Sequence, residues 1–347
     1  MIPYLKQGGT IGFAAPSFGC ATEPYKSAFQ NAMKQLSRLG FGLMPGPNCY
    51  ASEGIGISNT PEKCAAELMD MFLRDDVDAI ISCGGGEMMC EVVSHLDWEA
   101  LKKAKPKLYM GYSDNTNFDF LYATLCDGVS IYGPCVKAFG MEPWHESVYD
   151  ALNVLCGTKT TVQNYDGWQG NEDSLCDEMH PTAPYNCVRK ESFVTYSDGS
   201  TAVEYTAGPL AFEGRLIGGC LDCLATLVGT RFDRVSEYIE RHREEGLVWF
   251  LESCDLTVFG IRRAIWQLKE AGWFSGVKGF LIGRPMVYGQ EFGPLNQYNA
   301  VTDILKDFGV PIIMDTDIGH LPPAMPLLCG SRCRVTVGER LTIEQGL

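Results

Sequence analysis

Ser113 is the residue of this chain best placed for nucleophilic chemistry, in the run Leu108-Tyr-Met-Gly-Tyr-Ser-Asp-Asn-Thr116. An apolar segment ends just before it and a helical pattern begins just after it, which places the serine at a strand-to-helix junction. Free backbone N–H groups at such a junction favour developing negative charge, and Gly111 permits a tight turn. The elbow pattern G-x-S-x-G is only half met, because Asn115 stands where the second glycine would be. A nucleophile at Ser113 and a plain helix cap at Ser113 or Asp114 both fit this pattern.

A serine nucleophile needs a general base, and the chain has only five histidines. His320 follows the apolar run 310–314 and lies in Gly319-His-Leu-Pro-Pro323, a loop that two prolines stiffen. A histidine just past a buried strand is well placed for proton transfer, and a purely structural role also fits. The carboxylate that would orient the imidazole is expected at Glu252, which ends another apolar strand. Asp255 is a nearby carboxylate that fits a helix cap.

Gly84-Gly85-Gly86 follows an apolar strand at 78–82. Backbone N–H groups of glycines can approach a ligand closely, so one interpretation is half of an oxyanion hole opposite Ser113. A dinucleotide loop is an alternative, but the pattern G-x-G-x-x-G begun at Gly84 fails at Met89. A plain strand-to-helix turn also fits.

The elements that must position these residues alternate between short apolar strands and amphipathic helices over the first ~155 residues, a pattern typical of a parallel α/β sheet. We predict strands at 10–15, 78–82, 107–112 and 129–132. We predict helices at 24–39, from Pro61 onward, directly after the 107–112 strand through about Cys126, and at 146–156. A second lobe begins near Gly208, with helices after Gly219, near 233–243 and at 258–271, and with strands at 247–252, 276–282, 310–315, 334–337 and 341–344.

Between the lobes, residues 160–210 are rich in Asn, Asp, Gly, Thr and Tyr, and 193–205 has the pattern of a hairpin. We therefore expect three segments: an N-terminal nucleophile domain at 1–160, a linker and substrate loop at 161–207, and a C-terminal domain at 208–347 that carries the glutamate and the histidine.

The charge balance restricts the class of partner. The formal net charge is −15, and lysines and arginines form no stripe, so a nucleic acid would be repelled. No stretch approaches the ~20 apolar residues that a membrane span needs. The first residues carry one lysine and a short apolar run, which is not the pattern of a signal peptide. We expect a cytoplasmic protein without a nucleic-acid or membrane partner.

Fifteen cysteines are scattered along the chain without the spacing of a small disulfide-bonded domain. Cys220-x-x-Cys223 is one ligand pair without a second, which is a weak zinc signal. Free thiols packed in the core are the alternative. We expect no metal and no cofactor.

Six motifs in the same order along the chain resemble the LD-carboxypeptidases and their relatives, the microcin C immunity peptidases. They are Leu5 with Gly9-Thr-Ile-Gly-Phe-Ala-Ala-Pro-Ser17, the glycine turn 84–86, Gly111-Tyr-Ser-Asp-Asn-Thr116, Gly218-Gly-Cys-Leu221 with Gly229-Thr230, Leu251-Glu252, and Gly319-His-Leu-Pro-Pro-Ala-Met-Pro326. Two features depart from the family pattern: Cys220 replaces the usual asparagine, and the segment 160–210 is longer than in the cell-wall branch.

The resemblance implies a Ser113, Glu252 and His320 triad, with an oxyanion hole from the backbone N–H groups near Gly86 and Asp114. It also implies a flavodoxin-like or amidotransferase-like N-terminal lobe, a smaller C-terminal α/β lobe and a homodimer. The implied activity is that of a serine peptidase.

Two substrate classes fit the resemblance. One is a muropeptide cleaved between an L-centre and a terminal D-residue. The other is a peptidyl or aminoacyl nucleotide, which the long middle segment favours slightly. Gly85 and Trp168 are the expected substrate-binding residues, with the indole of Trp168 stacked on a nucleobase or else packed onto the protein. The rival interpretations are a two-lobed binding protein without chemistry and a nicotinamide enzyme, which the failed glycine pattern disfavours.

Overall fold

The N-terminal lobe is built on a sheet whose central strands are short, apolar and buried, as parallel strands covered on both faces must be. In the computed structural model, which describes residues 2–199, 202–203 and 210–346, this sheet has six strands in the order β17-β5-β4-β3-β1-β2. The strands are β1 (Thr10–Ala14), β2 (Gly42–Pro45), β3 (Ala79–Ser82), β4 (Leu108–Gly111), β5 (Ser130–Tyr132) and β17 (Leu327–Cys329). Five run parallel, and β17 pairs antiparallel with β5.

Helices lie between these strands along the chain. They are α1 (Tyr25–Arg38), α2 (Pro61–Leu73), α3 (Met89–Val92), α4 (Trp98–Lys103), α5 (Thr116–Cys126) and α6 (Glu146–Cys156). In α2 the first residue is Pro61, whose fixed φ suits that position, and the Thr60 side chain accepts a hydrogen bond from the Lys63 N–H. Its buried face carries Cys64, Leu68 and Phe72 at helical spacing.

The second lobe contains a wider sheet, which in the described residues has nine strands in the order β10-β9-β16-β13-β12-β11-β18-β19-β6. The strands are β6 (Thr161–Gln163), β9 (Val194–Tyr196), β10 (Ala202–Val203), β11 (Leu210–Cys220), β12 (Leu247–Glu252), β13 (Val277–Gly283), β16 (Ile312–Thr316), β18 (Arg332–Val337) and β19 (Leu341–Gln345). The four central strands β11, β12, β13 and β16 run parallel.

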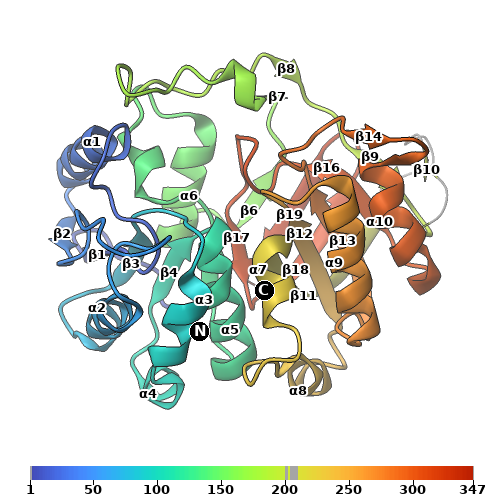
Figure 1. Ribbon diagram of the computed structural model, residues 1–347, viewed down its shortest axis with the longest axis horizontal. Coiled ribbons are helices and arrows are strands. Elements are labelled where there is room, and N and C mark those ends of the chain that lie inside the picture. The colour runs from blue at the N-terminus through green and yellow to red at the C-terminus, as the bar shows by residue number, and fades with distance from the viewer. Residues whose placement is uncertain (1, 200–201, 204–209, 347) are drawn as a thin grey trace.

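Four helices accompany that sheet: α7 (Leu221–Leu227), α8 (Val235–Arg241), α9 (Val258–Glu270) and α10 (Gln297–Leu305). Two small hairpins, β7 (Gly167–Trp168) with β8 (Arg189–Lys190) and β14 (Glu291–Phe292) with β15 (Leu295–Asn296), lie outside the two sheets. Figure 1 shows the lobes side by side, with β7 and β8 along one edge of the molecule.

The two lobes share strands. β17 comes from the C-terminal part of the chain and completes the N-terminal sheet, where Leu327 pairs with Tyr132. The lobes also touch at Gly219, where a Cβ would come 2.4 Å from Thr116 Cγ2. The Cys220 N–H donates to Thr116 Oγ1 at 2.9 Å. The first turn of α5 therefore packs directly on the end of β11.

The expected α/β class, with a parallel N-terminal sheet and a second α/β lobe, is confirmed. The segment boundaries at 160 and 207 remain predictions, and the second of them lies outside the described residues. Of the hairpin predicted at 193–205, β9 and β10 pair antiparallel, while residues 200–201 and 204–205 lie outside the described residues. Sequence patterns did not predict β11, β17 or α10.

Candidate active site

Ser113 lies where β4 ends and the chain turns into α5. Its φ is +65°, and it is one of three non-glycine residues in the described ranges with a left-handed backbone. Such a conformation costs about 1–3 kcal/mol and is typical of a nucleophile elbow. Asn115 stabilises the turn because its Nδ2 donates to the carbonyl oxygens of Tyr112 and Gly84, each at 2.9 Å. Asn115, which stands where the elbow pattern has a glycine, thus stabilises the turn through its own hydrogen bonds.

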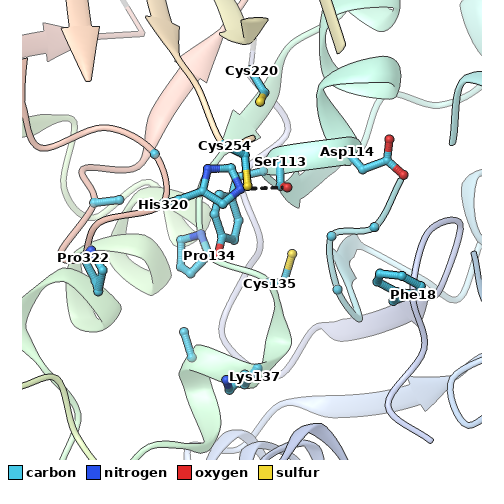
Figure 2. A pocket seen from close by; sticks show the side chains of 18 of the residues that line it. Phe18, Ser113, Asp114, Pro134, Cys135, Lys137, Cys220, Cys254, His320 and Pro322 are labelled. Atoms are coloured by element: carbon cyan, nitrogen blue, oxygen red, sulfur yellow. Dashed lines mark hydrogen bonds between the residues drawn. The ribbon is translucent and has the colours of Figure 1, made fainter. Parts of the chain in front are cut away.

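The structure brings together the three residues of the expected triad. Ser113 Oγ lies 2.8 Å from His320 Nε2, and His320 Nδ1 lies 2.7 Å from Glu252 Oε2. Figure 2 shows the imidazole of His320 directed at Ser113. The serine belongs to the N-terminal lobe, whereas Glu252 ends β12 and His320 follows β16 in the other lobe. The geometry allows a proton to pass from Ser113 to the imidazole.

Glu252 and His320 each favour the charged form of the other. Burial alone would lower the pKa of His320, but the Glu252 carboxylate and the Cys254 side chain together outweigh burial and hold that pKa well above its ordinary value. Burial alone would raise the pKa of Glu252, and the charge and hydrogen bond of His320 outweigh it, so the pKa of Glu252 lies below its usual range. Gly319 permits this close approach, since a Cβ there would lie 2.5 Å from Glu252 Oε2.

Tyr132, at the end of β5, is a site residue that sequence reasoning missed. Its hydroxyl donates to Glu252 Oε1 at 2.5 Å and accepts a hydrogen bond from the Ser113 N–H at 3.2 Å. The register places Tyr132 beside Gly111, at the same sheet edge as Ser113. The available signal was that β5 ends in Tyr132, a side chain with a polar tip, and that parallel neighbours such as β4 and β5 end at one edge of the sheet.

The expected oxyanion donors face the same cavity as Ser113. Within the described ranges, neither the Gly86 N–H nor the Asp114 N–H donates to another group of the protein. Gly85 lies against Ser113, since a Cβ there would come 3.0 Å from Ser113 Oγ. The roles of these three residues stay predictions.

Hydrogen bonds of the Asp114 side chain connect the region of the glycine turn 84–86 to the turn at Ser113. This side chain is buried, and Oδ2 accepts hydrogen bonds from Ser17 Oγ at 2.6 Å and from the Met89 N–H at 2.9 Å. Asn117 Nδ2 donates to Oδ1 at 3.0 Å. Burial raises the pKa of this carboxyl group, and these hydrogen bonds oppose the shift. Asp114 therefore helps to fix the distance between Gly86 and Ser113.

A cavity of about 520 Å³ opens over Ser113 and is walled by both lobes. Its aromatic side chains are Phe18, Tyr25, Tyr112, Tyr132 and Tyr185. The segment predicted as a substrate loop contributes Tyr185 and several other residues between Gln169 and Tyr185. The cavity is large enough for a small ligand with two or three residues or rings.

Trp168 is not brought to this cavity. Its indole is 4% exposed, and the guanidinium carbons of Arg189 and Arg284 lie over the ring, 4.8 and 5.1 Å from its centroid. The Tyr288 ring packs edge-on at 4.9 Å, and the indole Nε1 donates to the Lys190 carbonyl at 3.2 Å. Among the described residues that line the cavity, Trp168 is absent. Of the two roles considered for it, packing onto the protein fits this placement.

Cys220 and Cys223 flank the triad. Cys220 Sγ donates to Asp222 Oδ2 at 3.3 Å, and Cys223 Sγ lies 3.7 Å from the Ser113 carbonyl oxygen. Residues 2–199, 202–203 and 210–346 contain no group of three or more His, Cys, Asp or Glu side chains placed to hold a metal ion. Over the same residues, no helix is long and apolar enough to cross a membrane.

Comparison with known proteins identifies the family. The LD-carboxypeptidase N-terminal domain matches residues 11–133, and the LD-carboxypeptidase C-terminal domain matches residues 213–335. Among curated proteins, the probable murein peptide carboxypeptidase of Bacillus subtilis is 24% identical, over 99% of this chain and 94% of that protein. The microcin C7 self-immunity protein MccF of Escherichia coli is also 24% identical, over 95% of this chain and 91% of that protein.

Solved structures show the same fold over the whole length. An MccF-like protein from Bacillus anthracis superimposes with a TM-score of 0.80 at 23% identity, covering 99% of both chains. MccF in complex with glutamyl sulfamoyl guanosine gives a TM-score of 0.78 at 22% identity, covering 99% of this chain and 98% of that one. With both halves of the chain matched by the family's two domains, this protein belongs to the LD-carboxypeptidase family.

Proposed function

We propose that this protein is a serine hydrolase in which Ser113 is the nucleophile, His320 the general base and Glu252 the residue that orients the imidazole. The observation that carries the proposal is the continuous hydrogen-bonded chain from Ser113 Oγ through His320 to Glu252, with the serine held at a left-handed turn. A protein that only binds its ligand would not require a histidine nitrogen 2.8 Å from the hydroxyl of a serine with a left-handed backbone. The family membership supports the same class of chemistry.

In the proposed mechanism, Ser113 Oγ attacks the substrate carbonyl carbon while its proton passes to His320 Nε2. Negative charge that develops on the carbonyl oxygen is met by the Gly86 and Asp114 N–H groups. His320 then gives the proton to the leaving nitrogen or oxygen, and an acyl-enzyme remains. Water, deprotonated by His320, attacks this ester and releases the acid and the free serine. No metal ion takes part.

The substrate class proposed first is a peptide that ends in a D-residue after an L-centre, which makes the protein an LD-carboxypeptidase. The murein peptide carboxypeptidase relative, similar over nearly its whole length, supports this class. A peptidyl or aminoacyl nucleotide is the second class. The full-length likeness to the self-immunity protein MccF and the aromatic walls of the cavity, Phe18, Tyr25 and Tyr185, favour it.

The test compares wild-type protein with Ser113→Ala on an LD-tetrapeptide and on an aminoacyl sulfamoyl adenosine. Wild-type protein should turn over at least one of them, and Ser113→Ala should lose several powers of ten in kcat without a change in melting temperature. A fluorophosphonate should label Ser113, which mass spectrometry of the tryptic peptide would locate. Wild-type activity in Ser113→Ala would contradict the mechanism, and a protein that neither turns over nor labels would be a binding protein.

We propose further that the protein is cytoplasmic and forms a homodimer. All fifteen cysteines are free thiols, which supports a reducing compartment. Light scattering on the purified protein should give about twice the chain mass of 38.2 kDa, and fractionation of the source cells should recover the activity in the cytosol.

A further inference from the structure

The cavity over Ser113 is rich in thiols. Among the described residues that line it are seven of the fifteen cysteines: Cys83, Cys90, Cys135, Cys176, Cys220, Cys223 and Cys254. One of them, Cys220, stands where the family pattern has asparagine. The proposed mechanism of hydrolysis uses none of these sulfur atoms.

Cys220 and Cys223 are placed to form a disulfide with each other. Cys220 directly precedes α7, Cys223 is the third residue of that helix, and the two thiols hydrogen-bond to each other. Side chains three residues apart in a helical turn have Cβ atoms about 5–6 Å apart, and a disulfide holds Cβ atoms about 3.5–4.5 Å apart. Only a small local movement therefore separates the dithiol from a disulfide.

This pair of thiols lies between Ser113 and Glu252. Cys223 Sγ donates to the Ser113 carbonyl oxygen at 3.7 Å and lies 3.9 Å from Asp114 Oδ1. The thiol of Cys220 hydrogen-bonds to the Glu252 carboxylate. A sulfur atom in a disulfide has no hydrogen to donate, so formation of the disulfide would remove hydrogen bonds from both ends of the proposed triad.

Both thiols are protonated at neutral pH. The hydrogen bond with Cys223, followed by burial, raises the pKa of Cys220 well above its ordinary value. The hydrogen bond with Cys220 lowers the pKa of Cys223, but burial and nearby carboxylates outweigh it, so this pKa is also raised. Because the thiolate is the reactive form, oxidation is slow and the reduced dithiol is the resting form of the pair.

The pair is open to a small oxidant from the cavity. Cys223 is 9% exposed and Cys220 is 2% exposed, and both line the cavity wall. Hydrogen peroxide is small enough to reach the Cys223 sulfur by this route, so Cys223 is the thiol that reacts first.

We propose that Cys220 and Cys223 are a modification site, at which hydrogen peroxide converts the two thiols to a reversible disulfide that lowers the activity of the site at Ser113. Cys223 Sγ attacks a peroxide oxygen, the O–O bond breaks, and one water leaves a sulfenic acid behind. Cys220 Sγ then attacks that sulfur, the S–S bond forms, and the S–O bond breaks with loss of a second water. Two thiols are oxidised while one peroxide is reduced to two waters. Formation of the disulfide is independent of the proposed function, whereas its effect on turnover rests on it.

The first experiment locates the disulfide and needs no turnover. Wild-type protein is treated with hydrogen peroxide, alkylated, digested with trypsin and analysed by mass spectrometry. Cleavage after Arg215 and Arg231 gives a peptide, 216–231, that contains Cys220 and Cys223 and no other cysteine. After peroxide this peptide should be lighter by two hydrogen atoms and should resist alkylation, and dithiothreitol should reverse both changes. Alkylation of both sulfurs after peroxide would overturn the proposal.

A crosslink to a different cysteine would also overturn the proposed pairing. Cys90 and Cys254 line the same cavity, so they are the alternative partners. Peptide 216–231 joined to the peptide that contains either of them would assign the disulfide elsewhere. In Cys90→Ser and in Cys254→Ser the internal disulfide of 216–231 should still form.

The second experiment measures turnover before and after peroxide, with each variant compared to its own untreated rate. Wild-type protein should lose at least about tenfold in kcat, because small displacements of reacting groups can cost about a hundredfold, and dithiothreitol should restore the rate. Cys220→Asn and Cys223→Ser should each resist peroxide, whereas the control Cys90→Ser should lose activity as wild type does. Melting temperatures identify the variants that fold. A disulfide in 216–231 without loss of activity, or an equal loss in wild type and in a folded Cys220 or Cys223 variant, would overturn the effect on the site.

The two experiments distinguish this proposal from the proposed function. If wild-type protein turns over no substrate and does not react with a fluorophosphonate, the proposed function fails. The peptide 216–231 then still decides whether Cys220 and Cys223 form the modification site.

Discussion

The Tyr132 hydroxyl touches both ends of the proposed triad. The hydroxyl accepts a hydrogen bond from the Ser113 N–H and donates one to Glu252. One side chain therefore holds the turn at Ser113 close to the Glu252 carboxylate. Because Ser113 and Glu252 come from different lobes, the two hydrogen bonds of Tyr132 connect the lobes at this point. We propose that Tyr132 is a positioning residue, because both hydrogen bonds of its hydroxyl are made to Ser113 and Glu252.

Tyr132→Phe should lower both activity and stability. The change keeps the ring but leaves Glu252 Oε1 buried without this donor, which costs about 1–3 kcal/mol of the free energy of unfolding. We expect kcat to fall about ten- to a hundredfold on whichever substrate is turned over, with a lower melting temperature. Tyr238→Phe is the matched control, because the Tyr238 hydroxyl is buried without a hydrogen-bond partner in the described structure. Equal behaviour of the two variants would refute the positioning role.

In the proposed mechanism the charge state of His320 sets the pH dependence. His320 would have to be neutral to accept the proton of Ser113, and the Glu252 carboxylate, with Cys254, holds the pKa of His320 well above its ordinary value. The ascending limb of kcat/KM against pH should therefore have its midpoint above ~6.5. Glu252→Gln removes the charge that raises this pKa, so the midpoint should move to lower pH while the plateau rate falls. A midpoint that does not move would show that Glu252 does not control the imidazole.

The residues alone left other roles open at Ser113, Glu252 and His320, and the family resemblance selected them as a triad. The structure brings the three side chains within hydrogen-bond distance. Tyr132 could not be selected in the same way. Its role depends on the register of β4 with β5, which places it beside Gly111, and on the contact between lobes. Trp168 shows the opposite case, because an aromatic residue in a polar segment looks available for a ligand until its packing partners are known.

Among the elements, the β7–β8 pair contains the contacts that pack the long middle segment against the rest of the protein. Trp168 on β7 packs beneath Arg189 of β8 and Arg284, and these contacts connect the hairpin to the C-terminal lobe. The same segment continues into residues that line the cavity, up to Tyr185. The β7–β8 pair therefore supports the cavity wall formed by residues between Gln169 and Tyr185, while Trp168 itself does not line the cavity.

Trp168→Ala should thus act through packing. Removing a buried tryptophan costs about 3–5 kcal/mol of the free energy of unfolding, so the melting temperature should fall clearly. Turnover of an LD-tetrapeptide and of an aminoacyl sulfamoyl adenosine should decline together. Trp266→Ala is the control for loss of an indole, since Trp266 is 55% exposed. A selective loss on the nucleotide substrate with an unchanged melting temperature would restore the stacking role.

The helices and strands that could be predicted are those with a clear signal in their own residues. Helices α1, α6 and α9 were predicted within about two residues, and α2 was predicted to begin at Pro61 as it does, because their periodicity and first-turn residues are local. β11 was missed because it ends in Gly218-Gly219-Cys220, a composition that does not favour strands. β17 was missed because it is three residues long and follows a proline-rich loop. Its pairing with β5 joins positions almost two hundred residues apart, which no local pattern encodes.

At the scale of the whole molecule, the two lobes are not independent. β17 fills the edge of the N-terminal sheet, and the close contact of Gly219 with Thr116 packs α5 on β11. The reacting groups are also divided, with Ser113 in one lobe and His320 in the other. A geometry of 2.8 Å between them survives only if the lobes keep one relative position.

Unfolding should therefore be a single cooperative transition. In urea, far-UV circular dichroism and tryptophan fluorescence should give coincident curves, because loss of either lobe removes a strand or a packing face from the other. Activity should disappear over the same range of urea concentration. Two separated transitions would show that the shared strand contributes little to coupling between the lobes.

The shared strand also restricts how genes of this family can be recombined. Replacing residues 213–335 by the corresponding part of a relative would replace β17 as well, and with it the edge that pairs with β5. Leu327 then meets a Tyr132 inherited from a different parent, and Tyr132 is the residue whose hydroxyl lies between Ser113 and Glu252. In a library of chimeric proteins, crossovers that inherit residues 130–132 and 327–329 from the same parent should be enriched among the active clones.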